Sequence, residues 1–106
     1  MNAQFASSHP HALARAMAVL GRLQQVHDRW EMRSAAVFLL IAWRGEIEKP
    51  EMERLFSMSP ASGYRNIQLM QDALLVETEK VGGVTVVRLA ERGRVLAGEI
   101  GALMGG

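Results

Sequence analysis

Residues 48–93 read EKPEMERLFSMSPASGYRNIQLMQDALLVETEKVGGVTVVRLAERG. The pair Ser59-Pro60 marks the start of a helix, because serine caps helix N-termini and proline is favoured at the first helical position. Further along, Gly82-Gly83 separates two runs rich in valine and threonine, which is typical of a β-hairpin. The predicted order is a short helix, a turn, a second helix and a hairpin.

The helix that begins at Ser59 has two distinct faces. Its predicted inward stripe recurs at helical spacing and consists of Gly63, Ile67, Met70 and Leu74. The opposite side carries Ala61, Arg65, Gln68 and Asp72, with Tyr64 on its flank and Ser62 near the start of the helix. These groups can reach base edges or phosphates. A solvated face on an ordinary surface helix would have the same composition, so that alternative stays open.

The hairpin has a self-consistent register when Gly82 and Gly83 occupy its turn. The predicted cross-strand pairs are Val76 with Leu89, Glu77 with Arg88, and Thr78 with Val87. One face is then largely apolar and can cover the core, while the other places an acidic residue opposite a basic one. A helix-turn-helix followed by such a hairpin is a winged helix-turn-helix, which is mainly α with a small β-hairpin wing.

The flanking segments are predicted to support this unit within a single domain over residues 1–106. Residues 1–8 are expected to form a flexible tail. An N-terminal helix over residues 10–30 has an apolar face wide enough for both the core and a second subunit, although one broad core face in a monomer is the alternative. The winged core covers residues 34–93 and leads into a C-terminal helix over residues 91–104.

The helix that precedes residues 48–93 is apolar on nearly all sides and is expected at the centre of the domain. We expect Ser34 to cap it and Gly45 to end it. Aromatic and methionine side chains in this region could line a pocket for a small-molecule effector, or they could be plain core. These residues are Trp30, Met32, Phe38 and Trp43.

Composition limits the possible functions. The 106 residues are 49% hydrophobic and 22% charged, with a net charge of +1 and no cysteine. Without thiols the chain can form neither a disulfide nor a thiolate zinc site, so a reducing, cytoplasmic location is expected. No apolar run is long enough to cross a membrane. His9 and His11 have no third ligand nearby in sequence and no nucleophile motif occurs, so we expect no enzyme, metal or cofactor. Any basic DNA-binding surface must come from the placement of charges.

Residues 48–93 resemble the winged helix-turn-helix regulators, most closely those of the multiple-antibiotic-resistance regulator (MarR) type. Residues 51–59 look like the first helix and turn of that family, and residues 59–70 look like its recognition helix. Three features depart from the family pattern. Ser57 stands where the turn often has glycine, and this matters little if the backbone of Ser57 is not left-handed. The wing tip lacks the usual aspartate and arginine. The terminal helices are short for the family.

The resemblance implies a homodimer that binds double-stranded DNA, with the recognition helix over residues 59–73 in the major groove. We expect a transcription regulator that acts as a repressor. Arg65 and Gln68 are the best candidates for base contacts, because arginine reads guanine and glutamine reads adenine through paired hydrogen bonds. The residues expected at the DNA are Ser59, Ala61, Ser62, Tyr64, Arg65, Gln68, Lys80 and Arg88. The alternative is a winged helix used as a protein-interaction module, for example in a replication or partition complex of a plasmid or phage.

Overall fold

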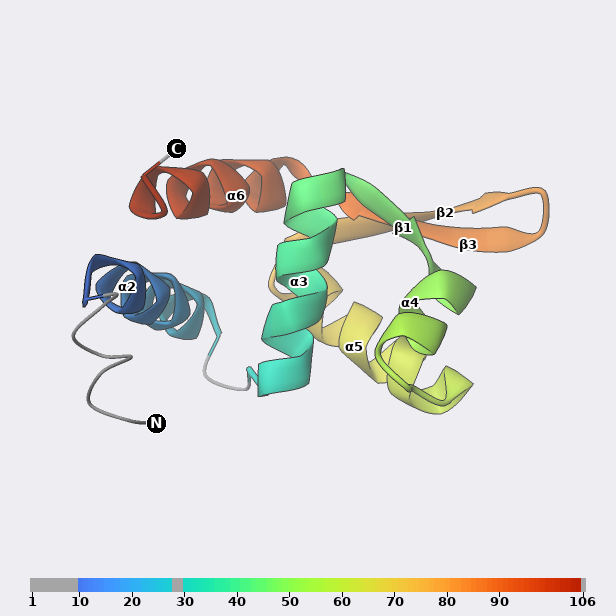
Figure 1. Ribbon diagram of the computed structural model, residues 1–106. Helices are drawn as coiled ribbons and strands as arrows, with labels where there is room; N and C mark the ends of the chain where they lie inside the picture. The colour runs from blue at the N-terminus through green and yellow to red at the C-terminus, as the bar shows by residue number, and fades with distance from the viewer. Residues whose placement is uncertain (1–9, 28–29, 106) are drawn as a thin grey trace.

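The computed structural model describes residues 10–27 and 30–105 of the chain. Its elements are α2 (Pro10–Val26), α3 (Met32–Arg44), β1 (Glu46–Glu48), α4 (Lys49–Leu55), α5 (Pro60–Asp72), β2 (Val76–Val81), β3 (Val84–Leu89) and α6 (Glu91–Leu103) (Figure 1). This is the predicted winged helix-turn-helix, in which α4 and α5 form the helix-turn-helix and β2 with β3 forms the wing. The predicted tail over residues 1–8, and His9, lie outside the described residues.

The wing forms in the predicted register. Val76 pairs with Leu89, Glu77 with Arg88, and Thr78 with Val87 in antiparallel strands. Gly82 and Gly83 occupy the tip with φ of 57° and 80°, which is the left-handed backbone that a tight two-residue hairpin turn requires. The hairpin prediction is therefore confirmed.

A third strand, β1, was not predicted. It pairs antiparallel with β3, so that β3 is the central strand of a sheet ordered β1-β3-β2. Its residues Glu46, Ile47 and Glu48 alternate exposed, buried and exposed. A run of 3 residues is too short for alternation to be told from chance, and only pairing with β3 makes it a strand.

Helix α3 lies at the centre of the molecule, between the α2 and α6 pair on one side and the helix-turn-helix with its wing on the other (Figure 1). Val37, Phe38 and Ile41 are completely buried, which confirms the central position that its apolar sequence predicts. Gly45 ends the helix as predicted, with φ of 89° and its N–H donating to the Ile41 carbonyl oxygen.

The prediction that Ser34 caps α3 is wrong. The helix begins at Met32, so Glu31 occupies the N-cap position and makes no side-chain capping hydrogen bond. Ser34 instead falls within the first turn and faces inward, where it is buried and its hydroxyl donates to Asn66 Oδ1. A capping residue must have extended backbone, and Ser34 is already helical.

The terminal helices α2 and α6 pack side by side and form the edge of the molecule away from the wing (Figure 1). The Arg22 guanidinium forms an ion pair with Glu99 at 2.6 Å across them. Helix α2 ends at Val26, which is shorter than the predicted 10–30. Among the described residues, no helix combines the length and the apolar character needed to cross a membrane.

Two residues other than glycine have left-handed backbone, Ser57 with φ of 53° and Leu74 with φ of 63°. Ser57 forms the turn between α4 and α5, so serine at this position carries a conformational energy cost that glycine would not. Leu74 was predicted on the inward stripe of the recognition helix, but it is 65% exposed. The helix ends at Asp72 and the chain reverses at Leu74, which turns this side chain outward.

The Leu74→Gly substitution is expected to raise the free energy of unfolding by about 0.5 to 1 kcal/mol. Removing the strain of a left-handed leucine stabilises the folded state by about 1 to 2 kcal/mol. This exceeds the roughly 0.4 to 1 kcal/mol lost because glycine increases the conformational entropy of the unfolded chain. Chemical denaturation measures the change. The control Gln71→Gly lies in α5 and is exposed, so it should lose about 0.5 to 1 kcal/mol. A loss at both positions would contradict the prediction.

Candidate nucleic-acid interface

Helix α5 presents its polar side away from the body of the protein. The Ser59 side chain caps it by accepting a hydrogen bond from the Ser62 N–H at 3.1 Å, and Pro60 occupies its first turn. The buried residues are Gly63, Asn66, Ile67 and Met70. The exposed residues include Ala61, Tyr64, Arg65, Gln68 and Asp72, as the helical wheel predicts. The start of the helix and its outward face therefore agree with the sequence prediction.

A buried lysine holds α5 against α4. Lys49 is only 8% exposed, and its ammonium forms an ion pair with Glu53 and donates to the Pro60 carbonyl oxygen at 3.4 Å. The same ammonium lies 4.1 Å from the centre of the Tyr64 ring, a cation–π contact. A Cβ atom on Gly63 would overlap the Glu53 carboxylate, so glycine permits this close approach.

Sequence reasoning did not single out Lys49. The spacing of four residues to Glu53 on one helix was a usable signal for an ion pair. Lysine is seldom buried, however, and nothing local indicates that Tyr64 covers it. The consequence is that Tyr64 has one ring face held by the helix-turn-helix itself.

On its other side, α5 is joined to α3 by buried polar side chains. Asn66 Oδ1 accepts a hydrogen bond from the Ser34 hydroxyl at 2.6 Å, and Asn66 Nδ2 donates to the Ser62 carbonyl oxygen at 2.9 Å. Because both ends of this buried amide are satisfied, the contact fixes one orientation of α5 relative to α3. The helix is thus held on both flanks while its polar face stays open.

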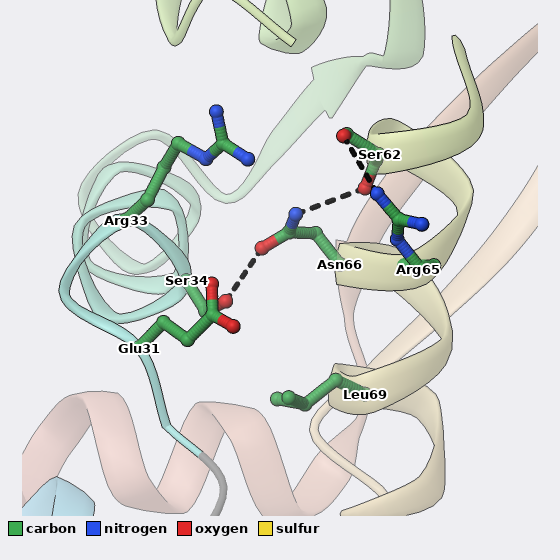
Figure 2. A pocket seen from close by; sticks show the side chains of 7 residues that line it. All are labelled: Glu31, Arg33, Ser34, Ser62, Arg65, Asn66 and Leu69. Atoms are coloured by element: carbon green, nitrogen blue, oxygen red, sulfur yellow. Dashed lines mark hydrogen bonds between the residues drawn. The ribbon is translucent and has the colours of Figure 1, made fainter. Parts of the chain in front are cut away.

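A cavity of about 330 Å³ opens between the start of α3 and this flank of α5. Figure 2 shows Arg33 extending from α3 towards α5, and Asn66 crossing between the helices to Ser34. Arg65 Nη2 donates to Ser62 Oγ at 3.1 Å along the α5 side. The lining residues are Glu31, Arg33, Ser34, Ser62, Arg65, Asn66 and Leu69.

The structure separates the two wing residues predicted at the DNA. Side chains alternate between the two faces of a strand. Lys80 therefore lies on the same face of the sheet as Val76, which is buried, whereas Arg88 lies on the outer face. Arg88 forms ion pairs with Glu79 and, at 3.6 Å, with Glu46. The hydrogen bond with Glu79 raises the pKa of the Arg88 guanidinium above its ordinary value.

The outer face of the sheet is acidic. The register places Glu46, Arg88 and Glu77 in one row across the three strands, and Glu48, Val86 and Glu79 in the next. Four glutamates therefore share the face away from the helices with one arginine. Since the chain carries a net charge of only +1, concentrating negative charge here leaves the remaining surface more basic than the total suggests.

The four residues proposed for an effector pocket do not form one. Phe38 is completely buried in the core, and Trp43 is 83% exposed at the far end of α3. Trp30 and Met32 do line a cavity of about 210 Å³, together with Leu20, Leu23, Gln24, Glu31 and Ala35. The prediction is corrected because Met32, Phe38 and Trp43, which are spread along α3, face different neighbours, and Trp30 precedes this helix.

Comparisons with known proteins support the fold. No protein-family model and no curated protein matches the sequence. Among solved structures, RV1404 from Mycobacterium tuberculosis has 15% identity and a TM-score of 0.73, with 97% of this chain and 70% of that chain covered. AbfR bound to DNA has 11% identity and a TM-score of 0.64, with coverage of 96% and 73%. Sco5413, a MarR family transcriptional regulator from Streptomyces coelicolor, has 13% identity and a TM-score of 0.58, with coverage of 98% and 76%. At these identities the likeness concerns the fold.

Proposed function

We propose that this protein is a sequence-specific, double-stranded DNA-binding transcription regulator that places α5 in the major groove. The observation that carries the proposal is the open polar face of α5, which is held on one flank by Lys49 and on the other by Asn66. A rigid helix with an unobstructed polar face is what groove insertion requires. The AbfR structure, which has the same fold and is bound to DNA, adds support.

The exposed residues of α5 suit different parts of a duplex. Arg65 and Gln68 have the paired donors and acceptors that read guanine and adenine, while the small Ala61 lets the backbone approach the bases. Ser59, Ser62 and Tyr64 are expected to contact phosphates and fix the register. From the wing, Lys80 is exposed beyond the part of the sheet that the helices cover and is expected at a phosphate, whereas Arg88 would have to leave its two glutamates to reach one.

A homodimer is the assembly that we propose. Helices α2 and α6 leave the large apolar side chains of Met17, Leu20, Val95 and Leu103 exposed, and Met104 directly after α6 is exposed as well. Such surface is seldom left uncovered in a soluble protein, and a second copy with the same apolar helices can bury it. A dimer should bind an inverted repeat with half-site centres roughly 34 to 36 Å apart, and occupying such an operator is expected to repress transcription.

The Arg65→Ala substitution is expected to weaken binding to the preferred site by about 1 to 3 kcal/mol, which is roughly fivefold to 150-fold, because a bidentate contact to guanine is lost. Selection of bound sequences from random duplexes first defines the site for the parent, and fluorescence anisotropy then gives both dissociation constants. Arg44→Ala, at the far end of α3 from the cavity and α5, controls for the loss of one positive charge. Unchanged affinity and salt dependence for Arg65→Ala would contradict the proposed role of this residue.

The acidic outer face of the sheet favours a second candidate function, that of a winged-helix module which binds a basic protein partner. Titration with bulk duplex DNA separates the two functions. A DNA-binding protein should bind bulk DNA at low salt and lose affinity as salt rises. Complete absence of binding at low salt would favour the interaction module.

A further inference from the structure

We propose that the cavity between α3 and α5 receives one phosphate of the DNA backbone, and that Arg33 is its main ligand. This inference rests on the proposed function and extends the interface to α3, which is not part of the helix-turn-helix. Arg33 lies 32 positions before Arg65 in the sequence, yet both side chains line the same cavity (Figure 2).

The position of the cavity relative to α5 is the first argument. Each residue advances about 100° around a helix, so the exposed arc of α5 runs from Tyr64 through Gln68, Ala61 and Arg65 to Ser62, where the cavity begins. The major groove is about 12 Å wide, and a helix inside it has a phosphate strand on each side. Tyr64 and the cavity lie on opposite edges of the arc, so the cavity faces one of these strands.

The chemistry of the lining is the second argument. The Arg33 guanidinium presents a planar fork of N–H donors that matches phosphate oxygens, and the Ser62 hydroxyl adds a further polar group. Arg65, whose fork is proposed for a base, adds positive charge at the edge of the cavity. The cavity has a volume of about 330 Å³ and is open to solvent, so a phosphate can enter together with part of its hydration. The one acidic residue in the lining is Glu31.

The third argument is that Arg33 has no other partner among the described residues. Most other described arginines are engaged, since Arg22, Arg44 and Arg88 pair with glutamates, and Arg92 and Arg94 donate to carbonyl oxygens. Among the described residues Arg15 and Arg54 also make no such contact, but neither lines this cavity. Arg33 makes no such contact in the described part of the chain and is exposed. The first N–H groups of α3 also lack a side-chain cap, so positive potential gathers at this end of the helix.

The test compares the parent, Arg33→Ala, Arg33→Lys and Arg44→Ala on the selected DNA site and on bulk duplex. Arg33→Ala is expected to weaken binding to both by the same factor, about threefold to tenfold, without changing the selected consensus. The slope of log affinity against log salt should fall by about 1. Lysine should restore part of the affinity, and Arg44→Ala should leave affinity and slope near those of the parent.

A complementary variant acts in the opposite direction. Glu31→Gln removes the acidic group from the lining and should tighten binding to both DNAs, because a phosphate would no longer meet a like charge. Circular dichroism verifies that each variant is folded. If the parent binds DNA while Arg33→Ala and Arg44→Ala behave alike, the phosphate site is refuted and the proposed function stands. If the parent binds no duplex at low salt, both are refuted.

Discussion

Replacing Phe38 with alanine is expected to lower the free energy of unfolding by about 3 to 5 kcal/mol. The phenyl ring is completely buried in the middle of α3, and its centre lies 6.0 Å from that of the Trp30 ring. Removing it deletes apolar contacts and leaves a cavity that several packed elements cannot fill without moving. Since small domains are stable by only about 5 to 15 kcal/mol, much of the total would be lost.

Urea denaturation followed by circular dichroism measures this loss, with the Trp43→Ala variant as the control. Trp43 lies on the same helix but is 83% exposed, so its removal should change the free energy of unfolding by no more than about 0.5 kcal/mol. Equal losses for the two variants would mean that the exposed tryptophan contributes to the fold as the buried ring does, and the assignment of the core would be wrong.

The Gly93→Ala substitution should be nearly as damaging, with an expected loss of about 3 kcal/mol, at the upper end of the range for overpacking. A Cβ atom at this position would overlap the carbonyl oxygen of Leu75. That oxygen accepts a hydrogen bond from the Ala90 N–H at 2.9 Å, which joins the start of α6 to the residue before the wing. The obstacle is backbone rather than a flexible side chain, so α6 itself would have to shift.

Gly98→Ala is the matched control for Gly93→Ala. Both glycines lie in α6, but a Cβ atom on Gly98 would meet nothing within 4 Å. Alanine is the better helix former, so Gly98→Ala should raise the free energy of unfolding by about 0.5 to 1 kcal/mol. Thermal unfolding of both variants measures the two changes. Stabilisation of both variants would show that helix propensity, and not the close approach to Leu75, decides the outcome at Gly93.

Much of the fold could be predicted because its signals are local. The Ser59-Pro60 start, the two faces of α5 and the glycine tip of the wing each depend on residues only a few positions apart. Predictions failed where a short segment gains its conformation from a distant partner. Strand β1 exists because it pairs with β3, and Ser34 makes its hydrogen bond with Asn66 instead of capping its own helix.

The candidate site was likewise predictable only where its signals are local. Helical spacing correctly placed Arg65, Gln68 and Tyr64 on the exposed side of α5. Strand alternation was equally readable for Lys80 and Arg88, which occupy opposite faces of the wing, but the ion pair of Arg88 with Glu46 depends on the unpredicted strand. The contacts of Lys49 and the proposed role of Arg33 could not be inferred from the sequence, because each depends on which surface its helix meets.

The amino-acid sequence by itself determined the order of elements, the register of the hairpin and the polar face of α5, because periodicity, capping and turn chemistry act over a few residues. Only the tertiary structure decided between chemically similar side chains on one helix, burying Phe38 and exposing Trp43. It also brought Arg33 and Arg65 to one cavity. The physical reason is that burial and pairing depend on contacts between segments far apart in the chain, which no local pattern encodes.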